Sequence, residues 1–110
     1  MDSREHRLVD NETTFREINE RIEQIAASQG PGDEHEYEFL CECSNSDCTL
    51  RVLLTVEAYE RVRSGPAQFL VALGHELPEI EEIVFVGPDY QVVRKFGEAA
   101  ELAAEKDPRS

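Results

Sequence analysis

Three cysteines lie close together in the sequence, as Cys41, Cys43 and Cys48 in a C-x-C-x4-C pattern. Residues two apart on an extended strand point to the same face, so the first two sulfurs are presented together. Residues 44–47 are Ser, Asn, Ser and Asp, turn formers that can fold the chain back and bring the third sulfur to the same point. Three thiols in this arrangement predict a single metal site.

Zinc is the metal that this arrangement favours, because it is tetrahedral and borderline-soft and binds thiolate sulfur at about 2.3 Å. Iron–sulfur clusters usually use four cysteines, one more than this chain contains. Turn backbone N–H groups between residues 44 and 47 could donate to the thiolates. Two other interpretations of the cluster stay open, namely buried core cysteines and a thiol redox centre.

A fourth ligand would complete the tetrahedron, and His75 is the residue best placed to supply it. It lies in Gly74-His75-Glu76 directly after a predicted strand, where glycine lets the backbone approach closely. Glu76 could orient the imidazole ring. With His75 bound, no coordination position stays open, which predicts a structural rather than a catalytic metal. The remaining candidates for the fourth position are His35, His6, Asp47 and Glu42.

The charge of the chain restricts its partners. Acidic residues outnumber basic ones by 24 to 11, giving a formal net charge of −13. Such a charge disfavours nucleic acid, which needs Lys and Arg to displace counterions from phosphates, and it disfavours anionic membrane surfaces. A basic protein partner is the electrostatic complement, although solubility alone also accounts for the charge.

The chain carries no Gly-rich phosphate loop, no G-x-S-x-G and no H-E-x-x-H, so no catalytic motif in the sequence indicates an enzyme. The first hypothesis is a small acidic zinc-binding protein with a structural metal site, serving as a protein-interaction or regulatory module. The first alternative is a thiol-redox or zinc-release sensor, and the second is a small metalloenzyme. Residues 1–10 lack an apolar signal and no apolar run approaches the roughly 20 residues of a membrane span, so we expect a cytoplasmic protein with reduced thiols.

The elements that must position the cluster begin with a helix. Thr14 and Glu17 form a capping box, which predicts a disordered tail over 1–13 and an amphipathic helix over 14–28. This helix would pack on the following domain or pair with a second copy as a short coiled-coil homodimer. Its apolar seam is Phe15, Ile18, Ile22 and Ile25. A linker over 29–35 follows, marked by Gly-Pro-Gly.

Residues 36–107 are expected to form one zinc-stapled α+β domain. Alternation over 36–43 and a second strand over 50–55 indicate a hairpin, and Thr55 caps a short helix that ends near Arg63. A strand over 69–73 precedes a polar connection at 78–82 and a second hairpin, with strands over 83–86 and 90–96. A helix over 98–106 and a tail over 108–110 close the chain. The pattern predicts a small antiparallel sheet of about five strands with three helices.

Several segments together resemble a group of small uncharacterised bacterial proteins that carry a C-x-C-x4-C cluster and a downstream Gly-His-Glu. The resemblance covers most of the chain, from about Phe15 to Asp107, and implies a bacterial cytoplasmic setting. It also implies that the cysteine and histidine segments belong to one recurring unit. The segments that carry it are Phe39–Cys43 with Cys48, Ala58–Arg63, Phe69–Val71, Gly74–Glu76, Val92–Ala99 and Phe15–Ile22.

Overall fold

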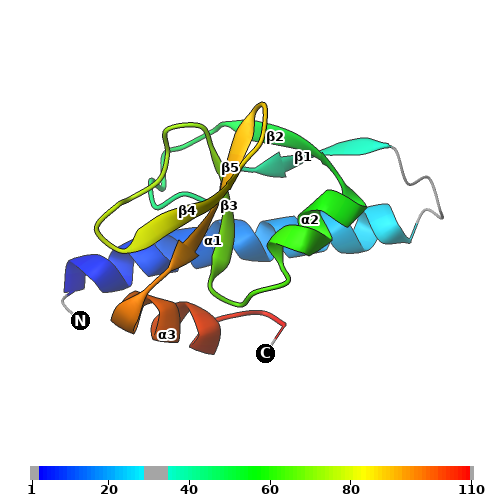
Figure 1. Ribbon diagram of the computed structural model, residues 1–110. Helices are drawn as coiled ribbons and strands as arrows, with labels where there is room; N and C mark the ends of the chain where they lie inside the picture. Colours follow the sequence, from blue (N-terminus) through cyan, green and yellow to red (C-terminus); the bar gives the residue numbers. More distant parts are fainter. Residues whose placement is uncertain (1–2, 29–34, 110) are drawn as a thin grey trace.

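The computed structural model describes residues 3–28 and 35–109, and most of the predicted linker, residues 29–34, lies outside them. The predicted α+β class is confirmed, and the elements follow the expected order (Figure 1). These elements are α1 (Ser3–Ala27), β1 (Glu36–Leu40), β2 (Arg51–Thr55), α2 (Val56–Val62), β3 (Gln68–Ala72), β4 (Glu81–Val86), β5 (Tyr90–Lys95) and α3 (Gly97–Glu105). Thr55 caps α2 as predicted, accepting a hydrogen bond from the Ala58 N–H at 3.1 Å. None of the helices within the described residues is both long and apolar enough to cross a membrane.

The strands divide into two sheets, so the prediction of one sheet is wrong. β1 and β2 form an antiparallel hairpin, and the other three strands form an antiparallel sheet in the order β3-β5-β4. The division arises where β1 ends, because Glu42 occupies the outer edge of β3. Its backbone N–H donates to the Leu70 carbonyl at 2.6 Å, and its side chain accepts from the Leu70 N–H at 2.9 Å. The Leu70 N–H therefore bonds to a side-chain carboxylate and not to a backbone carbonyl of a neighbouring strand, so the two sheets do not join here.

Helix α1 begins at Ser3, so the predicted tail over 1–13 is wrong for its described part. The predicted cap Thr14 lies inside the helix, where its hydroxyl donates to the Asp10 carbonyl at 3.0 Å. Val9 is fully buried, and Asp10 forms an ion pair with Lys106. Contacts with distant parts of the chain therefore stabilise the start of α1, where the local sequence gives no helix signal.

The face of α1 that packs on the protein is polar, which also differs from the prediction. Ile18 and Ile25 of the predicted apolar seam are 43% and 61% exposed. The buried positions recur at helical spacing and are Val9, Glu12, Thr13, Arg16, Asn19, Glu20 and Ala26. Figure 1 shows α1 running along the whole length of the molecule, with β1, α2 and α3 packed against it.

Two hydrophobic cores lie on either side of β3. Phe69 and Val71 belong to the first core, which also contains Cys41 and Cys43. Leu70 belongs to the second core, where the rings of Phe39 and Tyr59 stack with centroids 4.5 Å apart. Because neighbouring residues of β3 point in opposite directions, this one strand joins the two cores.

Ion pairs fix the C-terminal end against α1 and α2. Arg63, the C-cap residue of α2, is buried and pairs with Glu20 and Asp107. Arg109 pairs with Glu20 and Glu60, so the predicted tail over 108–110 makes specific contacts in its described part. Residue 110 lies outside the described residues.

Candidate metal centre

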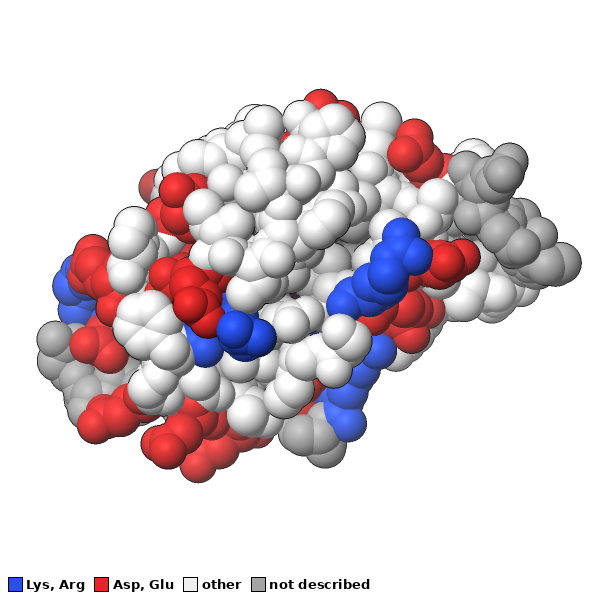
Figure 2. All heavy atoms as spheres, in the orientation of Figure 1, with Lys and Arg blue, Asp and Glu red and all other residues white. Residues whose placement is uncertain are grey.

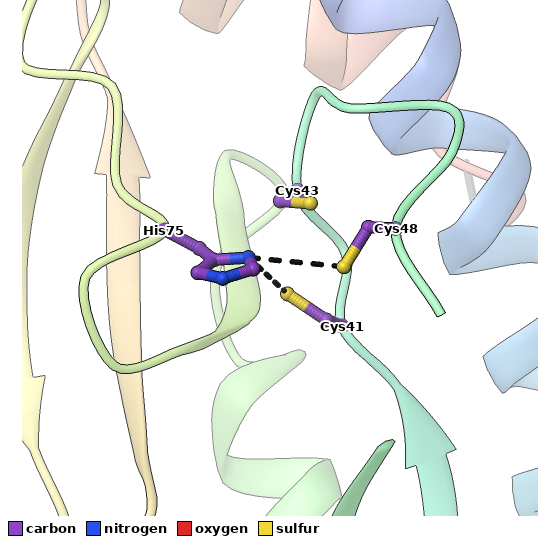
Figure 3. A group of neighbouring side chains, drawn as sticks. All are labelled: Cys41, Cys43, Cys48 and His75. Atoms are coloured by element: carbon purple, nitrogen blue, oxygen red, sulfur yellow. Dashed lines mark hydrogen bonds between the residues drawn. The ribbon is translucent and has the colours of Figure 1, made fainter. Parts of the chain in front are cut away.

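The structure brings together the four residues that the sequence proposed as ligands. Cys41 and Cys43 follow β1, Cys48 precedes β2, and His75 follows β3, as Figure 3 shows. Their donor atoms all lie within 4.8 Å of one another, so this group of described residues could hold a metal ion. Cys41 and Cys43 are buried, while Cys48 and His75 are partly exposed.

The distances between donor atoms agree with a tetrahedral ion. The Nδ1 atom of His75 lies 3.6 Å from the Cys41 sulfur and 3.7 Å from the Cys48 sulfur. A sulfur at about 2.3 Å and a nitrogen at about 2.1 Å from a tetrahedral centre lie roughly 3.6 Å apart. Both nitrogen–sulfur distances therefore match those between ligands of one tetrahedral ion.

The turn that returns Cys48 is held by Asn45. Its side-chain oxygen accepts from the Asp47 N–H at 3.0 Å, and its carbonyl accepts from the Cys48 N–H at 3.0 Å. An asparagine that binds the backbone two residues further on is a local turn signal, which explains why this part was predictable. It also means that the N–H groups of Asp47 and Cys48 bond to Asn45 and not to the thiolates.

On the opposite side, His75 is positioned by a turn at the end of β3. Gly74 has a φ of +81°, in the left-handed region that glycine adopts at little cost, and the His75 N–H donates to the Ala72 carbonyl at 3.1 Å. A Cβ at Gly74 would meet no atom within 4 Å, so this glycine is needed for its backbone angle and not for close approach. The predicted contact between Glu76 and the His75 ring is not among the hydrogen bonds of the described residues.

Hydrogen bonds distribute charge within the cluster. The Ala72 N–H donates to the Cys41 sulfur at 3.1 Å, so β3 supplies the support that the sequence assigned to the turn. A hydrogen bond shared between the two thiols raises the pKa of Cys41 and lowers that of Cys43 to about 5. Without a metal, the first proton therefore leaves this pair of thiols more readily than the second.

The other candidates for the fourth ligand lie outside the cluster. His35 is exposed and its ring lies 4.5 Å from that of Tyr37, measured between centroids. His6 is exposed on α1, and Asp47 is exposed in the turn. Glu42 points to the other side of the cysteine segment, where it has a different role.

Sequence reasoning considered Glu42 only as a candidate ligand and missed its structural role. It lies between two cysteines, is fully buried, and accepts hydrogen bonds from the Tyr59 hydroxyl at 2.6 Å and from the Asn19 amide at 2.9 Å, besides the bond from Leu70. Burial and the negative charge of Glu42 raise the pKa of Tyr59. The sequence did contain one signal of a buried polar contact. Glu12, Arg16 and Asn19 recur at helical spacing and mark a polar stripe on α1, to which Asn19, a partner of Glu42, belongs.

The fold and the cluster together define a small α+β protein with a candidate Cys3His metal centre. Comparisons with protein-family models, with curated proteins and with solved structures each found no match. The chemistry of the centre therefore follows from its own residues. Three sulfurs and one imidazole nitrogen can coordinate an ion from two loops that belong to different sheets.

Proposed function

We propose that the protein binds one zinc ion through Cys41, Cys43, Cys48 and His75, and that the ion is structural. The observation that carries the proposal is the origin of the donors. Cys41, Cys43 and Cys48 lie in the β1–β2 connection, and His75 lies in the β3–β4 connection. One ion would therefore tie the two-stranded sheet to the three-stranded sheet.

The donor set favours zinc over other common ions. Three thiolates suit a borderline-soft metal, whereas calcium and magnesium require oxygen ligands. Four protein donors fill the tetrahedral shell, and sites of that kind are structural, because a catalytic zinc keeps a position open for water or substrate. The ion also adds stability to a small domain that would otherwise depend on two small cores.

The biological role that fits a metal-fixed acidic domain is a protein-interaction or regulatory module. The net charge of −13 favours a basic protein partner, and the free thiols fit a reducing cytoplasm. Zinc contributes no redox chemistry of its own, so the module would act through its surface.

Metal analysis of the purified protein tests the site. After purification under reducing, zinc-replete conditions, we expect about one zinc per chain by elemental analysis. Cys48→Ser and His75→Ala should lose most of the metal, whereas the matched variant His35→Ala should retain it, because His35 lies outside the cluster. Absence of metal from the wild-type protein would reject the site, and zinc retained by His75→Ala would reject the fourth ligand.

Chelation tests the structural role. We expect the amide signals of 44–49 and 73–77 to lose their defined positions when zinc is removed, because the ion joins these loops. The Leu70 amide should stay protected from exchange, since it donates to Glu42 and not to a ligand. An unchanged spectrum would show that the metal has no structural role.

A zinc-release sensor is the second candidate, and the exposure of Cys48 favours it. Cys41 and Cys43 are buried, but Cys48 is only partly buried and is the sulfur that peroxide can reach. Oxidation would convert this thiolate into a sulfenate and release water from the peroxide, which weakens metal binding. Zinc release at low peroxide that Cys48→Ser abolishes would support the sensor, and zinc retention in the wild-type protein would remove it.

A further inference from the structure

Strand β4 presents an apolar edge to solvent. Among the strands of the described residues, it lies at the edge of its sheet and pairs with β5 alone. Ile83 is 41% exposed, Val84 is 40% exposed, Phe85 is 51% exposed and Val86 is 60% exposed. Edge strands usually carry charged residues, proline or bulges that prevent pairing with another chain. In β4 the charges, Glu81 and Glu82, lie at its start and the register shifts between Ile83 and Phe85, while the run 83–86 contains no charged residue and no proline.

A hollow adjoins this edge. It has a volume of about 420 Å³ and lies between α2 and the β4–β5 hairpin, with Val84 and Phe85 of β4 in its wall. The opposite wall includes Ala58 and Val62, and Arg61 and Gln68 supply its polar groups. Figure 2 shows a broad surface without charged side chains on the face where β4, β5 and α2 lie nearest the viewer, with charged residues at its margins.

The geometry of the edge selects an extended segment as its occupant. A strand added beside β4 would bond to its free main-chain groups, and every second side chain of that strand would point to the face of the hollow. Apolar side chains at alternate positions therefore fit both the hollow and the exposed run.

The charge of the chain indicates which residues should flank the apolar segment of the partner. Among the described residues, eight basic side chains already form ion pairs with carboxylates, namely Arg4, Arg16, Arg61, Arg63, Arg94, Lys95, Lys106 and Arg109. The charge that remains is mainly negative, since the chain has 24 acidic and 11 basic residues. A second copy would bring the same net charge of −13 to the interface, whereas Lys or Arg beside the apolar residues would be attracted.

We propose that β4 and the adjoining hollow bind an extended segment of a protein partner, with apolar side chains at alternate positions and basic residues on both sides. This rests on the proposed role as an interaction module, and it specifies the surface and the partner. Main-chain pairing would supply most of the affinity, the hollow would select the apolar side chains, and the flanking charges would raise the rate of association.

Two synthetic peptides that differ only in their flanks test the proposal. The first is Lys-Lys-Val-Thr-Val-Thr-Val-Lys-Lys, and the second has Glu in place of each Lys. With full-length protein of verified zinc content, we expect fluorescence anisotropy to show binding of the basic peptide that is about tenfold tighter than that of the acidic one. The preference should shrink in about 0.5 M salt, which screens the flanking charges. Amide shifts in the protein should map to β4.

Two matched variants separate strand addition from general attraction between opposite charges. Phe85→Ser should weaken binding of the basic peptide about tenfold, because it removes a wall of the hollow. Leu53→Ser removes a side chain of similar exposure, 54%, from β2 in the other sheet and should leave binding unchanged.

Equal weakening by Phe85→Ser and Leu53→Ser, equal binding of the two peptides, or amide shifts away from β4 would overturn the proposal. So would a homodimer in sedimentation equilibrium that Phe85→Ser dissociates, because the occupant would then be a second copy. Failure of peptide binding in protein that holds one zinc per chain would reject this surface and leave the metal site intact. Absence of zinc would instead reject the proposed function.

Discussion

Replacement of Glu42 by Gln tests whether the cysteine segment depends on its buried carboxylate. Gln keeps the size of the side chain and one carbonyl oxygen, which can still accept from the Leu70 N–H. In the wild-type protein the other carboxylate oxygen accepts from the Asn19 side-chain amide at 2.9 Å. Gln places an NH2 group at this position, so two hydrogen-bond donors face each other. The Tyr59 hydroxyl can turn and accept instead, which limits the damage.

The size of the effect follows from this exchange. A hydrogen bond to a charged group contributes about 1.5–3 kcal/mol, and an unsatisfied buried donor costs about 1–3 kcal/mol more. Removal of a buried charge offsets part of this loss. We therefore expect Glu42→Gln to lower the free energy of unfolding by about 2–4 kcal/mol. We also expect about tenfold weaker zinc binding, because Glu42 fixes the backbone between two ligands.

Urea unfolding of the zinc-loaded protein and competition with a zinc chelator measure the two effects. Glu38→Gln is the matched control, since Glu38 lies on β1 with its side chain exposed, and it should change stability by less than about 0.5 kcal/mol. Tyr59→Phe removes only the phenol hydroxyl, and the double variant with Glu42→Gln should show a non-additive effect. A Glu42→Gln protein with wild-type stability and wild-type zinc affinity would refute the reasoning.

Three further predictions concern the buried polar groups and the turn. Burial raises the pKa of Glu12 from 4.5 to about 8, so the folded protein binds more protons than the unfolded chain between these values and loses stability as the pH rises through them. Glu12→Gln should flatten the pH dependence of urea unfolding in this range. Parallel profiles for the variant and the wild-type protein would contradict this. Arg63→Met should cost about 3–5 kcal/mol in thermal or urea unfolding, because it removes the buried cation that Glu20 and Asp107 share and leaves Glu20 with Arg109 alone. Arg61→Met, at an exposed position two residues before Arg63, should cost less than about 1 kcal/mol, and equal losses for the two variants would be evidence against the buried pair. Gly74→Ala should cost about 1–2 kcal/mol through its left-handed backbone angle, and unchanged stability would show that the loop relaxes freely.

The parts of the fold that the sequence predicted are those with local causes. The cysteine spacing, the turn at Asn45 and the cap at Thr55 each depend on residues a few positions apart. The order of the strands in both hairpins also follows from local alternation and turn residues. His75 was found for the same reason, since it directly follows a strand with a clear pattern.

The parts that the sequence did not predict depend on contacts between distant residues. Glu12 on α1 pairs with Lys95 on β5, and Arg16 lies 3.7 Å above the ring of Phe69. These partners turn a charged stripe of α1 inward, so the apolar seam that usually marks the buried face points partly to solvent. The residues that make it favourable to bury these charged side chains lie outside the helix, so the helix sequence alone could not reveal the buried face.

The C-x-C spacing of the cysteines has a consequence that a C-x-x-C spacing would not have. Alternation along an extended segment sends Cys41 and Cys43 into one core and sends the residue between them to the opposite side. That residue is Glu42, and its three hydrogen bonds come from α1, α2 and β3. One short segment is therefore held from both sides, by the candidate metal centre on one side and by a buried carboxylate on the other. Because the carboxylate fixes the backbone before any ion arrives, two of the four donors are already oriented, which reduces the conformational entropy that metal binding would have to overcome.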